Sequence, residues 1–453
     1  MLRGSAVLLA LLASGAQGQT VIHAGELLDV ARGRVLEAHS ILIEGDRITG
    51  VQRGFVEAEN VIDLSDAFVM PGLIDMHVHI VTETTPQRYL QRFAWEPGDY
   101  AYNSVKFAER TLEAGFTAVR DLGTVHGLAQ SMRDAIERGD LIGPRIFTAG
   151  KSLATTGGHA DPSNGVNSDL RGDPGPVDGV VNSVEEARAG VRARYKEGAD
   201  LIKLTATGGV LSEARSGQNP QFTVAEIQAI VATARDYGYK VAAHAHGTEG
   251  MRRAVMGGVD SIEHGTFMDK EVMRLMREQG TWYVPTILAG MFVAEKAQID
   301  GYFSALVRPK AAAIGPQIKA TFARAYKAGV KIAFGTDTGV PPHGRNWEEF
   351  VHMVDAGMPA MEALQSATLH ASDLLGQADT LGKIEAGLKA DVVAYPRSPL
   401  DDIEVMGEVG FVMKGGQVYV DALAKPAEAP EADQEEAGGD GEAAAEAAAP
   451  PGS

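Results

Sequence analysis

The sequence predicts an α/β protein, namely a (β/α)8 TIM barrel with a small β-sandwich domain formed from both chain ends. Three observations favour this fold class. The 453 residues are enough for about two to three domains of ~150 residues, or for one large barrel with an accessory domain. The middle of the chain alternates apolar strands with helical patterns, as repeated βα units do. Short β-branched strands of similar texture stand at both ends.

The composition narrows the classes of function. The chain has 41 Lys and Arg residues, 60 Asp and Glu residues and a formal net charge of −19. This acidic balance argues against a nucleic acid or an anionic membrane as partner. The chain has no cysteine, which excludes disulfides, thiol nucleophiles, thiolate zinc sites and iron–sulfur clusters. With 45% hydrophobic residues, it can bury a sizeable core.

Residues 1–18 have the pattern of a signal peptide. Arg3 precedes an apolar run at 6–13, and small residues lead up to Gly18. The run is far shorter than the ~20 residues that a helix needs to cross a bilayer. We therefore expect a secreted protein without a membrane anchor, which would be periplasmic in a Gram-negative bacterium.

The two β-rich flanks, residues 19–70 and 381–421, are predicted to form one composite β-sandwich domain. Their strands are short, and Gly, Asp and Arg separate them. The final segment, 422–453, is acidic and rich in Ala, Glu, Pro and Gly. From Pro426 onward it has no base and no aliphatic residue larger than Ala. Such a segment cannot bury enough apolar surface to offset its ordering entropy, so we expect it to be disordered.

Residues 71–380 are predicted to form the barrel. The eight expected strands are Gly72–Val78, Thr117–Leu122, Arg145–Ala149, Ala199–Thr205, Lys240–His244, Val259–Glu263, Thr281–Thr286 and Val330–Gly335. Two intervening helices, 187–196 and 227–237, follow capping-box sequences, in which a Ser or Thr is followed three residues later by Glu. In such a barrel, functional side chains lie at the C-terminal ends of the strands.

Five of the predicted strands end in, or carry near their end, a side chain suited to a metal site. These side chains are His77 and His79 after the first strand, Lys203 in the fourth, His244 in the fifth, His264 after the sixth and Asp337 after the eighth. On a strand, residues two apart project from the same face, so His77 and His79 point together into the barrel mouth. Any one of these residues alone would more often be structural, but their joint placement predicts a metal centre. Imidazole and carboxylate ligands suit Zn²⁺, and also Mn²⁺ or Co²⁺.

These residues lie in motifs that resemble those of a known family. Three runs are similar to motifs of the amidohydrolase superfamily of metal-dependent hydrolases: MPGLIDMHVH at 70–79, IEHG at 262–265 and GTDT at 335–338. Lys203 and His244, which lie between the first two runs, belong to the same resemblance. The segment LGKIEAGLKADVV at 381–393 resembles the return of that superfamily into its β-sandwich. The resemblance covers about residues 20–421, and it is closest to the imidazolonepropionase-related subgroup, which contains Xaa-Pro dipeptidases and enzymes that cleave ochratoxin-type amides.

The resemblance implies two divalent metal ions, most suitably Zn²⁺. His77, His79 and Asp337 would hold the more buried ion, and His244 and His264 the other. Lys203 would bridge both as N6-carboxylysine formed from CO2, because a free ammonium group has no acceptor with which to bind a cation. The implied reaction is attack of a metal-bridging hydroxide on an amide or peptide bond to a C-terminal amino acid. Asp337 would act first as general base and then as general acid.

Further residues are candidates for contacts with the substrate. His159, in the loop after the third strand, is a candidate for both catalysis and substrate binding. Arg215 could bind an α-carboxylate, and His343 lies on a predicted rim loop. His246 shares a strand face with His244 and is an alternative to it as metal ligand. Many subgroup members have a tyrosine where this chain has Phe222, which removes one substrate contact and argues against a strict Xaa-Pro preference.

Three functions are compatible with these residues. The first is a dipeptidase, carboxypeptidase or N-acyl-amino-acid amidohydrolase, whose partner is a small peptide or N-acyl amino acid and which could be a homo-oligomer. The second is a lactonase, phosphotriesterase or cyclic-amide hydrolase that uses the same site, because one hydroxide attacks many electrophiles. The third is a non-catalytic barrel scaffold, although a scaffold would be expected to have lost ligands.

Overall fold

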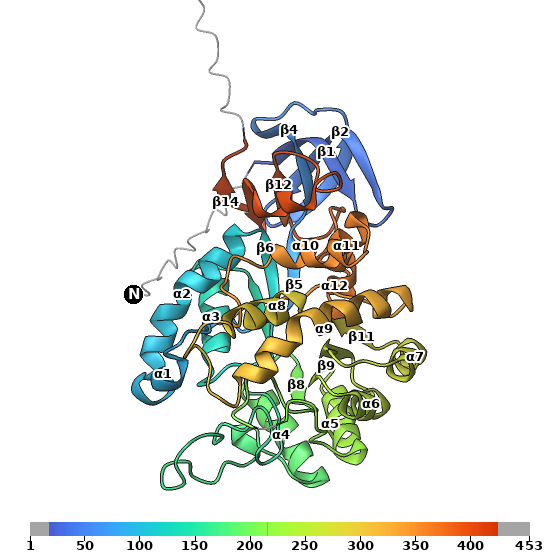
Figure 1. Ribbon diagram of the computed structural model, residues 1–453. Helices are drawn as coiled ribbons and strands as arrows, with labels where there is room; N and C mark the ends of the chain where they lie inside the picture. Colours follow the sequence, from blue (N-terminus) through green and yellow to red (C-terminus); the bar gives the residue numbers. More distant parts are fainter. Residues whose placement is uncertain (1–17, 215, 425–453) are drawn as a thin grey trace, which may run out of the picture.

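The computed structural model describes residues 18–214 and 216–424. The predicted signal peptide and acidic tail lie outside the described residues, apart from Gly18 and residues 422–424. Within the described part, no helix combines the length and the hydropathy that a membrane-spanning segment would need. Figure 1 shows a β-rich upper part above a larger α/β part. In the upper part, strands from the start of the chain lie beside strands from its end.

Strands from both ends of the chain form one mixed seven-stranded sheet, in the order β14-β13-β12-β4-β1-β2-β3. Its strands are β1 (Thr20–Asp29), β2 (Arg34–Glu44), β3 (Arg47–Arg53), β4 (Asn60–Pro71), β12 (Val392–Tyr395), β13 (Phe411–Lys414) and β14 (Gln417–Asp421). The antiparallel pairing of β12 with β4, in which Val392 lies opposite Pro71, joins the two ends.

The predicted sandwich is therefore a single hydrogen-bonded sheet in this structure. Buried side chains from its two halves, including Ile22, Ile41, Val392 and Phe411, belong to one apolar cluster. Strands from both ends of the chain therefore share one apolar core, as the prediction of a composite domain requires.

The middle of the chain alternates strands and helices. Its strands are β5 (Leu73–Val78), β6 (Phe116–Asp121), β7 (Arg145–Thr148), β8 (Ile202–Thr205), β9 (Val241–Ala245), β10 (Ser261–His264) and β11 (Trp282–Val284). Its helices are α1 (Arg88–Ala94), α2 (Pro97–Glu113), α3 (Leu128–Glu137), α4 (Val184–Lys196), α5 (Val224–Asp236), α6 (Thr248–Gly257), α7 (Lys270–Gln279), α8 (Ile287–Lys296), α9 (Arg308–Lys327), α10 (Glu348–Asp355), α11 (Ala360–Ser366) and α12 (Leu369–Leu375). Short 3-10 helices occur at Pro176–Asp178 and Ile403–Gly407.

The middle strands form two parallel sheets, β5-β6-β7 and β11-β10-β9-β8. Parallel bridges connect the sheets at both ends: Leu153 pairs with Leu204 at one junction. At the other junction, the extended segment that follows α9 pairs with β11 at Ile332 and with β5 at Thr338. This segment is the predicted eighth strand, and the prediction of a regular strand at Val330–Gly335 is wrong. The segment joins its neighbours through isolated bridges rather than a continuous ladder, and the backbone turns after it at Asp337, whose φ is 59°.

Both predicted capping sequences begin helices, but only the second forms a complete capping box, because the Glu186 carboxylate accepts from the Asn182 amide rather than from the Ser183 amide. The Ser183 hydroxyl accepts a hydrogen bond from the Glu186 amide at the start of α4. At the start of α5, Thr223 and Glu226 accept hydrogen bonds from each other's backbone amides. Each such cap satisfies helix N–H groups that would otherwise have no partner.

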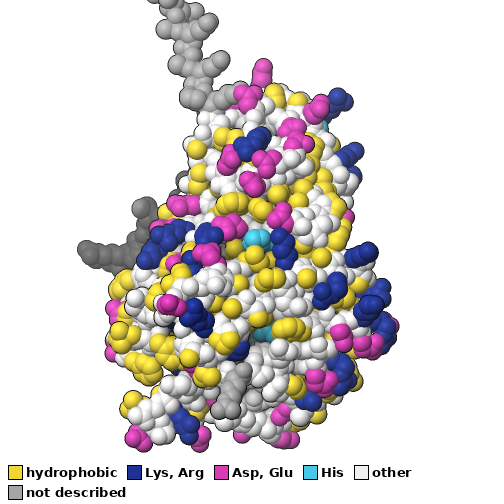
Figure 2. All heavy atoms as spheres, viewed as in Figure 1, with side chains coloured by type: hydrophobic (Ala, Val, Ile, Leu, Met, Phe, Trp, Pro, Cys, Tyr) yellow, Lys and Arg dark blue, Asp and Glu magenta, His cyan; other side chains and the backbone are white. Residues whose placement is uncertain are grey.

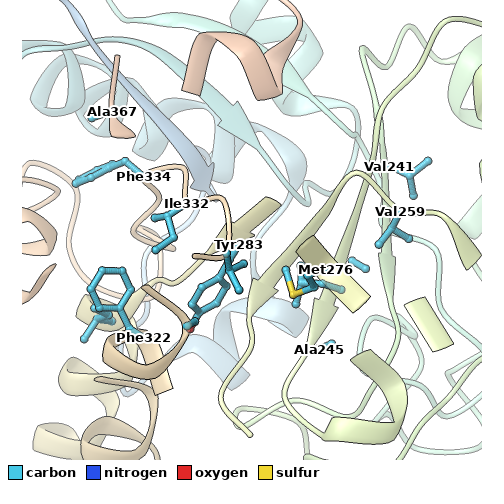
Figure 3. Close-up of a cluster of buried hydrophobic side chains, with 14 of the residues drawn as sticks. Val241, Ala245, Val259, Met276, Tyr283, Phe322, Ile332, Phe334 and Ala367 are labelled. Carbon is cyan, nitrogen blue, oxygen red and sulfur yellow. The ribbon is translucent and has the colours of Figure 1, made fainter. Parts of the chain in front are cut away.

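The main apolar core lies between the parallel strands and the helices that cover them. Figure 3 shows Tyr283, Phe322, Ile332 and Phe334 side by side in this cluster. Burying an aromatic or aliphatic side chain of this size contributes roughly 1.5–3 kcal/mol. The phenol of Tyr283 also donates to the backbone oxygen of His264 at 2.9 Å, so the core directly supports the end of β10.

Candidate active site

The strand-end residues meet at the base of one cavity of about 1030 Å³. The predicted metal ligands that line it are His77, His79, Lys203, His244, His264 and Asp337. His79 is the most exposed of them, with 28% of its side chain accessible, whereas His77, Lys203 and His264 are buried. On the face shown in Figure 2, acidic and basic side chains are interspersed with apolar ones.

The first group of potential ligands consists of His77, His264 and Asp337, whose ligand atoms lie within 4.8 Å of one another. The Asp337 Oδ1 atom is 3.4 Å from His77 Nε2 and 3.2 Å from His79 Nε2. Oδ1 is buried and has no hydrogen-bond partner among the described residues. A buried carboxylate oxygen without a partner is costly, and a bound cation would satisfy it.

The second group consists of His244, His246 and His264. Nδ1 of His246 bonds to the Thr266 hydroxyl, and Nδ1 of His264 bonds to the Thr286 hydroxyl, both at 2.8 Å. These bonds leave Nε2 of both rings free to bind a metal. The second group therefore includes His246 as well as the two predicted ligands, so the alternative assignment of His246 remains compatible with the geometry.

Burial keeps four of the site histidines neutral, whereas for His79 the adjacent Asp337 carboxylate outweighs burial and raises the pKa. It lowers the pKa of His77 and of His246 to about 4, and the pKa values of His244 and His264 lie well below the usual value. Neutral imidazole is the form that binds metals. Burial also lowers the pKa of Lys203 to about 8, against the opposing effect of the neighbouring carboxylates. At pH 7 this leaves about a tenth of the amine unprotonated, and the unprotonated amine is the form that reacts with CO2.

A buried ion pair holds His77 in place. Nδ1 of His77 bonds to Glu263 Oε2 at 3.0 Å, and the Arg120 guanidinium donates to Glu263 Oε1 at 2.9 Å. Arg120 also donates to the Met76 carbonyl and to the Ser261 hydroxyl. Arg120 and Glu263 are both almost completely buried. A carboxylate on the far nitrogen of a metal-binding histidine fixes the orientation and protonation of its ring.

His159, a predicted substrate contact, lies against one of the candidate metal ligands. Its ring stacks on His244, with centroids 4.3 Å apart and planes at 29°. Its Nδ1 is 2.5 Å from the Ser212 hydroxyl. Burial and the neighbouring cationic groups lower its pKa to about 3, so the ring is neutral at physiological pH.

A cationic side chain without a partner also lines the cavity. Arg88, at the start of α1, is a lining residue and is exposed to solvent. Its guanidinium makes no hydrogen bond or ion pair with the residues that the structure describes. Desolvation by the surrounding protein lowers the pKa of Arg88, and the charge of Asp337 opposes this shift. Arg88 therefore adds a positive charge to the lining of the cavity.

The sequence is similar to those of known proteins over most of its length. Residues 68–419 match the amidohydrolase family. The chain belongs to this family. Ochratoxinase of Aspergillus niger is 34% identical over 370 residues, which cover 78% of this chain and 75% of that protein. This amidohydrolase is therefore a hydrolase that acts on amide bonds.

Solved amidohydrolase structures are similar over most of the chain. The structure of a Xaa-Pro dipeptidase with methionine bound in its active site is 54% identical, with a TM-score of 0.87, and the match covers 89% of this chain and 100% of that one. A prolidase in complex with N-methylphosphonate-L-proline is 33% identical, with a TM-score of 0.82, and the match again covers 89% of this chain and 100% of that one.

Not all predicted substrate contacts occur in this amidohydrolase. His343 is buried, and its ring nitrogens bond to the Thr82 carbonyl and the Thr111 hydroxyl. It is not among the residues that line the cavity, so the structure gives no support to a role of His343 in substrate binding. Phe222 is part of the apolar core. Arg215 lies outside the described residues.

Two features of the site were absent from the sequence prediction, namely the buried pair of Glu263 with Arg120 and Arg88, which is unpaired among the described residues. Glu263 lies beside Ile262 in the fully buried strand β10, and a charge in a buried strand is a signal that it needs a buried partner. Arg120 gives the same signal within the fully buried strand β6. Arg88 gives no comparable signal, because a single arginine in a polar segment is usually solvated.

Proposed function

We propose that the protein is a two-metal amidohydrolase that cleaves the amide or peptide bond to a C-terminal amino acid. The class includes dipeptidases, carboxypeptidases and N-acyl-amino-acid amidohydrolases, with ochratoxin-type amides among the substrates. The observation that carries the proposal is the pair of ligand groups that share His264 beside Lys203 at the base of one cavity. The proposal includes a closed (β/α)8 barrel, which the bridges at both junctions of the parallel sheets support.

The residues present fit two divalent cations, for which Zn²⁺ is the proposed identity. His77, His79 and Asp337 would hold one ion, and His244 and His264 the other. Lys203 would bind both after conversion to N6-carboxylysine. The buried Asp337 Oδ1 without a hydrogen bond supports this assignment, and so do the neutral imidazoles.

The side chains of this protein then have separate tasks. When bound, the two cations supply an activated water and polarise the scissile carbonyl. The Asp337 carboxylate accepts the proton of the attacking water and delivers it to the leaving amine. His159 has Nδ1 committed to Ser212, so Nε2 is the atom that remains for a hydrogen bond to the substrate carbonyl oxygen.

Arg88 supports the substrate class. A guanidinium binds a carboxylate with two parallel hydrogen bonds, and a C-terminal amino acid carries that carboxylate next to the scissile bond. Lactones and phosphotriesters offer no such group, so the unpaired guanidinium favours amides of amino acids over these alternatives. The ligand and the analogue in the two similar structures, methionine and a proline phosphonate, also carry a carboxylate.

Export is part of the proposal. Arg3, the apolar run at 6–13 and the small residues before Gly18 support it. Fractionation of cells that express the full chain would detect processed protein outside the cytoplasm. Retention of the unprocessed chain in the cytoplasm would contradict export.

The reaction can be tested with a substrate panel. Protein purified with zinc and bicarbonate would be assayed on N-acyl amino acids and dipeptides, on their C-terminal amides, and on lactones and paraoxon-type esters. We expect hydrolysis of the amides that carry a free α-carboxylate, together with about two zinc ions per chain. Turnover confined to lactones or phosphotriesters would replace the proposal by the second class. No turnover and less than half a metal ion per chain would favour a scaffold.

A further inference from the structure

Lys310 commits its entire ammonium group to one loop. It lies in the first turn of α9, and Nζ donates to the carbonyl oxygens of Gly209, Ser212 and Ala214 at 3.2, 2.7 and 2.9 Å. An ammonium group has three donors and no acceptor, so these three bonds use all of its hydrogens. The arrangement ties a helix on one side of the cavity to the loop that follows β8.

This loop fixes His159 from two sides. Ser212, only 9% exposed, places its hydroxyl 2.5 Å from Nδ1 of His159. The ring also lies against the backbone of Gly209. A Cβ added to this glycine would lie 2.2 Å from Cε1 of the His159 ring. The ring therefore rests against the loop backbone at one point and bonds to a loop side chain at another.

The position of His159 matters because its ring lies on His244. The same loop contacts that ligand directly, since Nε2 of His244 is 3.1 Å from the Gly208 carbonyl oxygen. Apolar side chains of the loop, Val210 and Leu211, pack against buried residues of α8 and α9. Apolar packing tolerates sliding, whereas three hydrogen bonds from one atom define the position of the loop backbone.

We propose that Lys310 is the positioning residue for His159. By binding the three carbonyl oxygens, it holds Ser212 against Nδ1 of His159 and thereby fixes which ring nitrogen meets the substrate. The inference rests on the proposed function only in giving His159 a substrate contact. The placement of His159 by the loop does not depend on the identity of the substrate.

The variant Lys310→Met keeps the aliphatic stem and removes the three donors. We expect kcat/KM on the best substrate of the panel to fall about 10- to 100-fold, because a displaced catalytic group loses about this much. Metal content and the circular dichroism spectrum should be unchanged. The matched control is Lys319→Met on the same helix, where Nζ pairs with Asp355 at the surface; this variant should retain wild-type activity.

A double-mutant cycle separates positioning from general stability. In a His159→Gln background, adding Lys310→Met should change kcat/KM by less than about twofold, because the residue that it positions has gone. An equal loss in both backgrounds would overturn the proposal, and so would full activity of the single variant. Lys310→Arg, which keeps the charge and several donors, should restore part of the activity.

A spectroscopic readout remains valid if the substrate class proves wrong or if activity is lost for another reason. In histidine labelled with ¹⁵N, long-range ¹H–¹⁵N spectra identify the tautomer of each ring, and the His159→Gln variant assigns the His159 signals. We expect Lys310→Met and Ser212→Ala to change these signals in the same direction, while Lys319→Met leaves them unchanged. His159 signals that are identical in Lys310→Met and wild type would refute the role of Lys310 even in an active enzyme.

Discussion

Replacing Arg120 by methionine should lower the free energy of unfolding by about 3–5 kcal/mol. The guanidinium is 1% exposed and donates to the Met76 carbonyl, to Ser261 and to Glu263. Without it, the Glu263 carboxylate would stay buried with only neutral partners. The double variant Arg120→Met/Glu263→Gln removes both charges, so it should recover about 2 kcal/mol or more of this loss.

The same pair should control metal binding through His77. Glu263→Gln replaces the charged partner of His77 Nδ1 by a neutral one, and we expect zinc affinity to fall about 10- to 100-fold. Stability would be measured by urea denaturation of the metal-free protein, and zinc affinity by competition with a chelator. Glu271→Gln, which breaks a surface pair with Arg274, is the control and should cost less than about 1 kcal/mol. A double variant as unstable as Arg120→Met, or wild-type zinc affinity in Glu263→Gln, would refute the reasoning.

Three further predictions concern the site and its support. Lys203→Ala, assayed with ample zinc and bicarbonate, should bind less metal and lose about 10³-fold or more in kcat/KM; undiminished turnover would contradict the two-metal site. Arg88→Met should lose about 10- to 100-fold in kcat/KM on substrates with a free α-carboxylate but little on their C-terminal amides, and equal losses on both would exclude carboxylate binding. Burial raises the pKa of Glu349 to about 8, and its carboxyl group accepts hydrogen bonds from the Ile287 and Leu288 amides. The folded protein therefore retains a proton that the unfolded chain releases, so stability should decline from about pH 4.5 to pH 8, by as much as about 5 kcal/mol. Urea midpoints of metal-free Glu349→Gln should show a flatter decline than wild type; identical profiles would refute this assignment.

Patterns local in the sequence predicted much of the site. His77 and His79 share a strand face because side chains alternate along a strand, and parallel strands bring their carboxyl ends together. These two rules are enough to gather the candidate ligands at one cavity. The helix caps at Ser183 and Thr223 are equally local, since each hydroxyl accepts from the amide three residues later.

Features that depend on distant pairings could not be predicted in this way. The contact of Arg120 with Glu263 requires the register of strands that lie far apart in the chain. The left-handed backbone at Asp337, just after the eighth segment, is a conformation that non-glycine residues rarely adopt, so the residue type does not predict it. The burial of His343 was not predicted, because a rim loop can also turn its side chain inward, where the Thr82 carbonyl and the Thr111 hydroxyl bond to it.

The meeting of both chain ends in one sheet has a consequence for synthesis. β4 leads directly into the strand that carries His77, yet its neighbour β12 belongs to the last part of the chain. A ribosome must therefore produce almost the whole polypeptide before β4 gains this neighbour. Until then β4 has a free edge, and an exposed edge can pair with another molecule. Prematurely terminated copies are therefore the ones that should aggregate.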